Sequence, residues 1–144
     1  MLTKSVYNIN AILPGDIVVK RIYQVPNELH SRFSAVQREY QYFIYQQKDP
    51  FNQDKAYYYP YSLDLNLLQQ AAAILLTYQD FSSFSKRNTQ VKSFICNIAV
   101  SKWEQQKDGF VYTVKANRFL RGMVRGLVGT MLRVGTGKLI INDF

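Results

Sequence analysis

Residues 94–116 read FICNIAVSKWEQQKDGFVYTVKA, and this stretch indicates the fold class. Apolar residues alternate with polar ones along both of its halves, which is typical of β-strands with one buried face. The inward positions predicted for the two strands are Phe94, Cys96, Ile98, Val100, Phe110, Tyr112 and Val114. Between the halves, Asp108-Gly109 is a tight-turn signal, because glycine permits the positive φ that such turns require. The stretch therefore predicts an antiparallel β-hairpin.

Three segments before the hairpin also have strand character. Residues 37–47 are the strongest, because aromatic and β-branched side chains recur there at every second position. The side chains predicted for one face are Arg38, Tyr40, Tyr42 and Ile44, with Phe43 and Tyr45 on the other. Residues 16–25, opened by Pro14-Gly15, and residues 56–59, stopped by Pro60, predict two shorter strands.

Two segments predict helices. Residues 65–77 follow Asp64, a residue type that caps helix N-termini, and the predicted apolar face comprises Leu65, Leu68, Ala72, Leu75 and Leu76. A second helix is predicted from a cap at Asn117 to about Val134, ended by Gly135-Thr136-Gly137. The resulting order of strands and helices predicts an α+β fold, with a mostly antiparallel sheet and helices packed on one face. We expect a single domain over residues 1–144.

The second predicted helix has two unlike faces. Its apolar side comprises Phe119, Leu120, Met123, Val124, Leu127 and Met131, and its opposite side comprises Arg118, Gly122, Arg125, Gly129 and Arg133. Glycine inside a helix costs about 1 kcal/mol relative to alanine. The recurrence of Gly122, Gly126 and Gly129 therefore indicates a close approach, either by backbone of this protein or by a ligand that the arginines reach.

The charge balance favours a polyanionic partner. Lysine and arginine number 18 against 10 acidic residues, for a net charge of +8. This excess fits RNA or DNA binding, and by itself it fits plain solubility equally well. Its distribution favours nucleic acid, because no acidic residue occurs between Gly109 and Asn142. The basic residues in that interval are Lys115, Arg118, Arg121, Arg125, Arg133 and Lys138.

Several function classes are excluded or disfavoured. The single cysteine, Cys96, allows no internal disulfide and no thiolate metal cluster, and we expect it to be an inert core thiol. The single histidine, His30, leaves no His-rich metal site, so its role is structural or RNA-contacting. Phosphate-binding loops and the GxSxG and HExxH motifs are absent. Without a membrane-length apolar run or a signal-peptide pattern, the sequence fits a reducing cytoplasm.

Aromatic and basic residues occur together at two places. Tyr40 follows Arg38 on one predicted strand face, and Lys86-Arg87 follows the aromatic stretch of residues 81–84. Such combinations let bases stack on rings while cations meet phosphates. The alternative is that these rings are packing residues of a β-rich protein.

Five short strings, in order along the chain, resemble the TruA family of tRNA pseudouridine synthases. They are LPGDI at residues 13–17 (preceded by Asn10-Ala11), HSRFSA at 30–35, REYQY at 38–42, DFSSF at 80–84, and KANRF at 115–119 with its continuation to Met123-Val124-Arg125 and Val128-Gly129. Together they cover the chain from about Asn10 to Gly137. The resemblance implies one half of a pseudouridine synthase fold, an isomerase that converts uridine to pseudouridine in the anticodon stem-loop of tRNA. It also implies no cofactor, no metal and a homodimer for the full-length protein.

The resemblance also implies roles for individual residues. Tyr40 matches the tyrosine that packs against the target base, and Arg125 matches the arginine that pairs with the catalytic carboxylate. Both roles are physically reasonable, since a flipped base needs a stacking partner and a guanidinium keeps a carboxylate ionised. The residues expected to bind the RNA are Arg32, Arg38, Lys86, Arg87, Arg118 and Arg121.

The sequence departs from the family at its nucleophile. That residue is the aspartate of a Gly-Arg-Thr-Asp-Ala-Gly motif, which lies before the matched region in the family. No aspartate of this chain has that context, and the aspartates are Asp16, Asp49, Asp54, Asp64, Asp80, Asp108 and Asp143. We therefore expect a fragment of the enzyme, truncated at both ends and inactive alone. A degenerate family member or a non-catalytic RNA-binding module is the alternative.

Overall fold

The computed structural model describes residues 2–31, 33–87 and 90–144. The chain divides into two compact units, residues 1–35 and residues 36–144. That these residues form a single domain stays a prediction. Each unit is described by itself.

The first unit contains one described helix, α1 (Leu2–Ile12), followed by irregular chain. The predicted strand at residues 16–25 is wrong, because no described residue of that segment pairs in a sheet. The Asn10 side chain binds the backbone amide and carbonyl of Val19, which pairing in a sheet would require. Its Nδ2 donates to the Val19 carbonyl at 2.9 Å, and its Oδ1 accepts from the Val19 amide at 2.8 Å.

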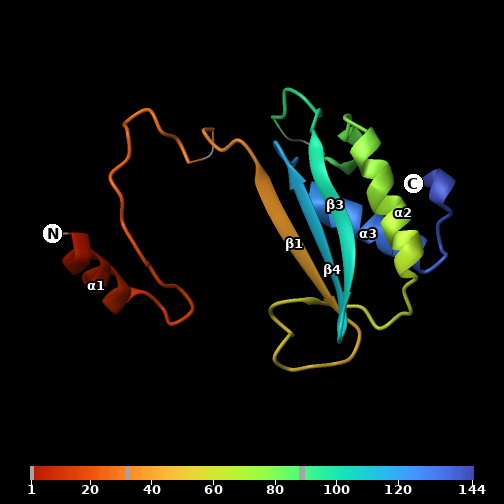
Figure 1. Cartoon of the computed structure of the whole chain (residues 1–144), viewed down its shortest axis with the longest axis horizontal. Helices are drawn as coiled ribbons and strands as arrows, with labels where there is room; N and C mark the ends of the chain where they lie inside the picture. The colour runs from red at the N-terminus through yellow and green to blue at the C-terminus, as the bar shows by residue number, and fades with distance from the viewer. Residues whose placement is uncertain (1, 32, 88–89) are drawn as a thin grey trace. The chain divides into compact units, whose positions relative to one another are not determined.

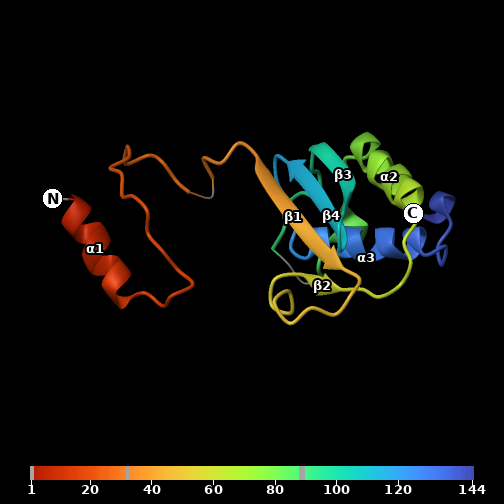
Figure 2. The same ribbon diagram turned by 60° about the horizontal axis from the view of Figure 1, so that its bottom comes forward.

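The second unit is built on a four-stranded sheet of order β2-β1-β4-β3. Its main elements are β1 (Arg38–Tyr45), β2 (Tyr57–Tyr58), α2 (Leu65–Ile74), β3 (Ile98–Gln106), β4 (Gly109–Ala116) and α3 (Met123–Gly135). β4 pairs antiparallel with both β1 and β3, and the short β2 pairs parallel with β1 at the sheet edge (Figure 2). The predicted α+β class with a mostly antiparallel sheet is confirmed.

The β3–β4 hairpin is present, but its glycine has a different role from the one predicted. The turn residues are Lys107 and Asp108, and Gly109 is the first residue of β4. Gly109 does not adopt a positive φ; the described glycines that do are Gly122 and Gly137. A Cβ at Gly109 would instead run into the carbonyl of Ile44 on the neighbouring strand. Close approach of two backbones therefore requires this glycine.

The predicted alternation along β3 fails at a bulge. Cys96 is buried and Ile98 packs against the core, as predicted. The pairing with β4 then shifts between Ile98 and Val100, so the next buried residues are Ser101 and Trp103. One extra residue in a strand reverses which side chains point inward, and periodicity read along the segment cannot detect it.

The helices begin and end differently from their sequence patterns. Asp64 caps α2 as predicted, since its Oδ1 accepts from the amides of Asn66 and Leu67 at 2.7 and 3.2 Å. Leu76 is 48% exposed instead of inward, because the chain tightens into a 3-10 turn at Leu75–Thr77 and leaves the α-helical period.

The start of α3 at Met123 corrects the predicted start at Asn117. The Asn117 side chain is occupied elsewhere, since its Oδ1 accepts from the Asn97 amide at 2.8 Å. Gly122, at the N-cap, has a φ of 81°, a left-handed conformation that cannot continue a helix. Residues 117–122 therefore form a loop that leads from β4 into α3.

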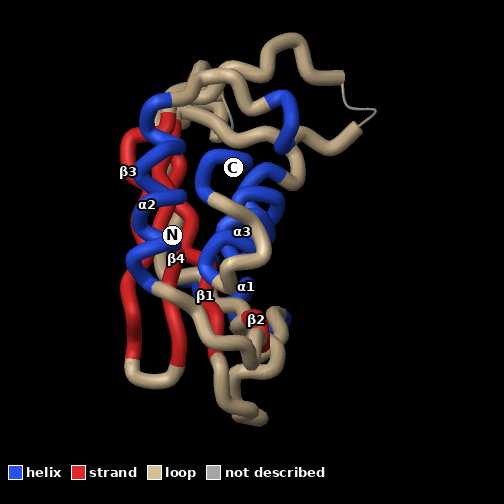
Figure 3. The backbone as a smooth tube through the Cα atoms, turned by 90° about the vertical axis from the view of Figure 1, so that its right-hand side faces the viewer, coloured by secondary structure: helices blue, strands red, loops and turns tan. Residues whose placement is uncertain are grey.

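The core lies between the sheet and the two helices. α2 and α3 pack side by side, and α2 also packs on β3 (Figures 1 and 3). The largest fully buried side chains of the sheet and helices are Trp103, Tyr112, Val114, Leu68, Met123, Leu127 and Met131. The inward positions predicted for β4 are thus confirmed. The loop that leads into α3 reaches the strand that carries Tyr40, because the rings of Phe119 and Tyr40 are in contact.

Candidate functional site

Tyr40 lies near the start of β1 on the face that carries the core. Val114, directly opposite it on β4, is fully buried on that face. Tyr40 itself is 48% exposed. Its ring meets the ring of Phe119 in an edge-on arrangement, with centroids 5.2 Å apart. An aromatic ring held at one edge and open to solvent elsewhere can serve as a stacking surface for a planar ligand.

Arg125 lies in the first turn of α3 and is exposed. Burial raises the pKa of Tyr42, the nearby phenol of Tyr57 raises it further, and the guanidinium of Arg125 lowers it. An effect on the Tyr42 phenol requires the Arg125 charge to lie near that side chain. Tyr42 is two residues from Tyr40 on the same face of the strand. That Tyr40 and Arg125 flank one nucleobase stays a prediction.

Other predicted RNA-binding residues gather around the loop of residues 117–122. Arg38 donates from Nη1 to the Asn117 carbonyl at 3.3 Å. The Lys86 amide donates to the Arg121 carbonyl at 2.9 Å, which ties the two loops together. Arg118 lies close enough to Cys96 to lower that thiol's pKa, although burial is the larger effect and raises it. We call Arg38, Lys86, Arg118 and Arg121 the basic rim.

Two other residues expected to bind the RNA, Arg87 and Arg32, are not part of the basic rim. Arg87 is exposed and follows Lys86 directly, but residues 88 and 89 beyond it are not described. Arg32 lies outside the described residues. Its neighbour His30 belongs to a turn in the first unit, where His30 Nδ1 accepts from the Phe33 amide at 3.3 Å and the two rings pack at 4.5 Å.

The three glycines of the second predicted helix, Gly122, Gly126 and Gly129, lie in different surroundings. Gly122 supplies the left-handed turn before α3. Gly126 faces Phe84, because a Cβ there would lie 3.3 Å from the ring, so the approaching group belongs to this protein. Within the described residues, nothing lies within 4 Å of a Cβ built at Gly129. This protein's own structure thus explains Gly122 and Gly126, whereas nothing in the described residues explains Gly129.

The electrostatic surroundings leave several guanidinium groups available for an incoming anion. Among residues 2–31, 33–87 and 90–144, neither Arg118, Arg121 nor Arg125 forms an ion pair; the ion pair found there joins Lys102 to Glu104. The same residues contain no cluster of side chains that could hold a metal ion. No described helix has the length and apolar character needed to cross a membrane.

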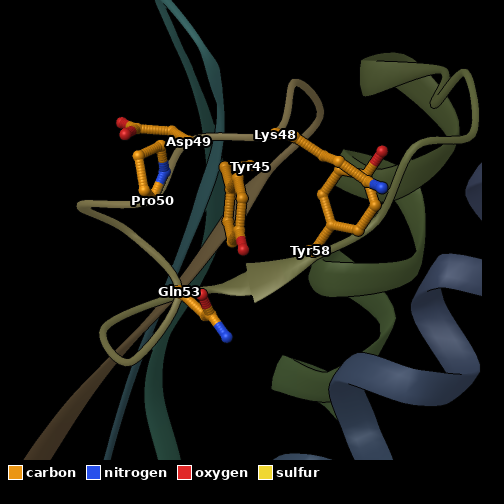
Figure 4. Close-up of a pocket in the computed structure, with 6 residues that line it drawn as sticks. All are labelled: Tyr45, Lys48, Asp49, Pro50, Gln53 and Tyr58. Carbon is orange, nitrogen blue, oxygen red and sulfur yellow. The ribbon is translucent and has the colours of Figure 1, made fainter.

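A separate pocket lies at the other end of β1. It has a volume of about 470 Å³ and is lined by Tyr45, Lys48, Asp49, Pro50, Gln53 and Tyr58 (Figure 4). The Asp49 carboxylate is already used inside its own loop, since it accepts from the Phe51 amide at 2.9 Å and from Asn52 Nδ2 at 2.7 Å. The pocket is therefore a feature of the β1–β2 loop and not part of the Tyr40 site.

Sequence reasoning missed one group of residues near the site. Tyr57, Tyr59 and Tyr61 form successive ring contacts that start at Tyr42 and end under the ammonium of Lys138. The available signal was the recurrence of tyrosine at every second position in YYYPY, residues 57–61. It was read as strand character because strands and stacking surfaces use the same aromatic residues.

The chain is similar to a family and to several known proteins that are described as tRNA pseudouridine synthases. Residues 71–144 match the profile of a family described as tRNA pseudouridine synthase. A tRNA pseudouridine synthase A of Parabacteroides distasonis is 46% identical over 136 residues, covering 94% of this chain and 54% of the relative. The protein of that name in Bacteroides fragilis is 44% identical over 142 residues, covering 98% and 56%. The one in Bacillus licheniformis is 38% identical over 139 residues, covering 95% and 56%. The chain thus spans about half the length of the curated relatives it matches.

Proposed function

Because this chain belongs to the tRNA pseudouridine synthase family, we propose that its full-length protein isomerises uridine to pseudouridine in the anticodon stem-loop of tRNA. In this proposal, the chain supplies part of the catalytic site and part of the RNA-binding surface. A homodimer of the full-length protein belongs to the same proposal. The observation that carries it furthest is the half-exposed Tyr40 ring held edge-on against Phe119, in the loop that leads into the helix of Arg125.

Tyr40 and Arg125 take different parts in the proposed reaction. The exposed ring of Tyr40, held at its edge by Phe119, stacks on the uracil after the base leaves the RNA stack. The Arg125 guanidinium pairs with the nucleophilic carboxylate and keeps it ionised, since a neighbouring positive charge lowers a carboxyl pKa. None of this chain's aspartates has the sequence context of that nucleophile, so the carboxylate comes from the remainder of the full-length protein.

The basic rim orients the RNA. Phosphate contacts from lysine and arginine position a nucleic acid without reading its sequence, and they release counterions. Arg38, Lys86, Arg118 and Arg121 gather around one loop at the entrance to α3, close to the Phe119 that supports Tyr40. Their placement supports a path for the tRNA backbone toward the Tyr40 ring.

Single-turnover tritium release from tRNA labelled in uracil tests the proposed reaction. In the full-length protein, we expect Arg125→Ala to slow the reaction by at least about 100-fold while tRNA affinity changes little, because its partner is the catalytic carboxylate. Arg133→Ala, which removes an exposed arginine from the last turn of the same helix, is the matched control and should keep the rate. If Arg125→Ala lost affinity alone and kept its rate, the catalytic pairing would be wrong.

A non-catalytic RNA-binding module is the second candidate function. The sequence context of the aspartates favours it for this chain taken alone. In that case the full-length protein would bind tRNA and release no tritium.

A further inference from the structure

A line of tyrosines leads from the candidate site along the edge of the sheet. The ring centroids of Tyr42 and Tyr57 are 6.4 Å apart, those of Tyr57 and Tyr59 are 6.0 Å apart, and those of Tyr59 and Tyr61 are 5.1 Å apart. We call Tyr57, Tyr59 and Tyr61 the tyrosine row. Tyr57 is 48% exposed and Tyr61 is 56% exposed, so the row lies at the surface.

The row is held in place by the sheet and by the loop that follows it. The Tyr59 amide donates to the Tyr45 carbonyl at 2.9 Å, next to the short parallel pairing of β2 with β1. Gln46 Nε2 donates to the Tyr61 carbonyl at 2.7 Å. Pro60, between Tyr59 and Tyr61, has a φ angle that its own ring fixes. The rings are therefore presented by a constrained backbone, which lowers the entropy lost when a ligand stacks on them.

A positive charge ends the row. The Lys138 ammonium lies 5.0 Å from the centroid of the Tyr61 ring, within the range of a cation–π contact. Lys138 belongs to the acid-free interval between Gly109 and Asn142. Asp64, the acidic residue nearest to Tyr61 in sequence, caps α2, and the helix N-terminus offsets its charge. The charge of this surface therefore suits a polyanion.

We propose that the tyrosine row and Lys138 bind nucleotides of the tRNA that adjoin the target uridine. Unpaired bases stack on the tyrosine rings while the ammonium meets a phosphate, the combination that single-stranded RNA sites use. The proposal rests on the proposed function, because Tyr57, at one end of the row, contacts Tyr42 on the strand face that also carries Tyr40. It extends the RNA contact beyond Tyr40 and the basic rim, to the end of α3.

Fluorescence anisotropy with the 144-residue chain tests the row directly. The two probes are a labelled anticodon stem-loop RNA and a fully paired RNA duplex with the same number of phosphates. Tyr61→Leu should weaken stem-loop binding about tenfold and leave duplex binding unchanged, because only unpaired bases can stack on the ring. Lys138→Gln should weaken binding of both RNAs and lower the salt dependence by about one counterion.

Matched variants separate the row from general surface effects. Tyr78→Leu removes a tyrosine that is 58% exposed and lies outside the row, and Lys107→Gln removes an exposed lysine from the β3–β4 turn. Both should bind stem-loop RNA like the unmodified chain. Tyr61→Phe keeps the ring and should keep the affinity, which distinguishes stacking from the hydroxyl's contacts. Thermal unfolding of each variant identifies any that fail to fold. If Tyr61→Leu does not fold, the affinity and salt dependence of Lys138→Gln test the proposal instead.

The outcomes distinguish a failure of RNA binding by the tyrosine row from a failure of the proposed isomerisation. If the unmodified chain binds the stem-loop and folded Tyr61→Leu binds it equally well, the row is not an RNA site and the proposed isomerisation is unaffected. If the unmodified chain binds neither RNA, the inference also fails. Tritium release by the full-length protein then still decides the proposed function independently.

Discussion

The Tyr40 ring meets the Phe119 ring edge-on, with centroids 5.2 Å apart. Tyr40 belongs to β1, and Phe119 belongs to the loop that leads into α3, so this contact joins a strand to a loop 79 positions later in the chain. Such an aromatic pair contributes about 0.5–1.5 kcal/mol beyond the burial of its area. The contact therefore holds the proposed stacking surface at a defined angle.

A double-mutant cycle measures this contact. Tyr40→Leu and Phe119→Leu should each lower the free energy of unfolding, and the double variant should lose about 0.5–1 kcal/mol less than the two single losses combined. Urea unfolding of the four proteins supplies the values. Strictly additive losses would mean that Phe119 does not support Tyr40.

Arg121 offers a test of the basic rim. In the full-length protein, Arg121→Ala should weaken binding by a similar factor for every tRNA substrate, because a phosphate contact carries no sequence information. It should also flatten the dependence of log affinity on log salt concentration by about one counterion. Dissociation constants over a series of salt concentrations provide the measurement. A selective loss for one tRNA would indicate contact with a base.

The 144-residue chain by itself should release no tritium from uracil-labelled tRNA. The covalent step requires a nucleophile, and none of the chain's aspartates has the motif context of the family's nucleophile. The assay should be run beside the full-length protein at equal concentration. Turnover above background by the chain would require a nucleophile among its own aspartates.

Replacing Gly109 or Gly129 by alanine should change the free energy of unfolding in opposite directions. Gly109→Ala should destabilise the protein by about 3 kcal/mol, because the new methyl would meet the Ile44 carbonyl. Gly129→Ala, in the exposed part of α3, should stabilise it by up to about 1 kcal/mol, since alanine favours the helix and the space is open among the described residues. Urea midpoints of both variants test the pair. Equal midpoints would contradict the assigned backbone contact at Gly109.

Stability should fall at high pH because of Tyr112. Burial raises the pKa of Tyr112 to about 12, with a smaller opposing effect from its 2.8 Å hydrogen bond to Ser101. Above the unfolded pKa of about 10, the unfolded chain loses this proton while the folded protein keeps it. The folded state then binds more protons, so the free energy of unfolding decreases as pH rises from about 10 to about 12.

Tyr112→Phe is the control for this pH dependence. It should remove up to about 1.4 kcal/mol per pH unit of the decline between pH 10 and pH 12, because phenylalanine does not titrate. Urea unfolding at a series of pH values measures both proteins. Parallel declines in the two proteins would assign the loss to other groups.

The sequence by itself determined the features that depend on neighbours along the chain. The pattern in residues 110–114 identified Tyr112 and Val114 as core residues, because every second side chain of a strand lies on one face. It did not identify Val111 and Thr113, which are buried on the other face. Asp64 was identified as a helix cap because its carboxylate reaches amides only two and three residues ahead. The five family-like strings were also local, and the family assignment followed from them.

Tertiary structure decided the features that depend on partners distant in sequence. Asn117 does not cap α3 because Asn97 occupies its side chain, and Gly109 is required by the backbone of Ile44, not by the turn. The contacts of Phe119 with Tyr40 and of Lys138 with Tyr61 likewise join residues that lie far apart in the sequence. Periodicity reports which side of a segment is buried, but it carries no information about which other segment covers that side. The elements of the candidate site could therefore be predicted from the sequence, whereas their assembly into one surface required the fold.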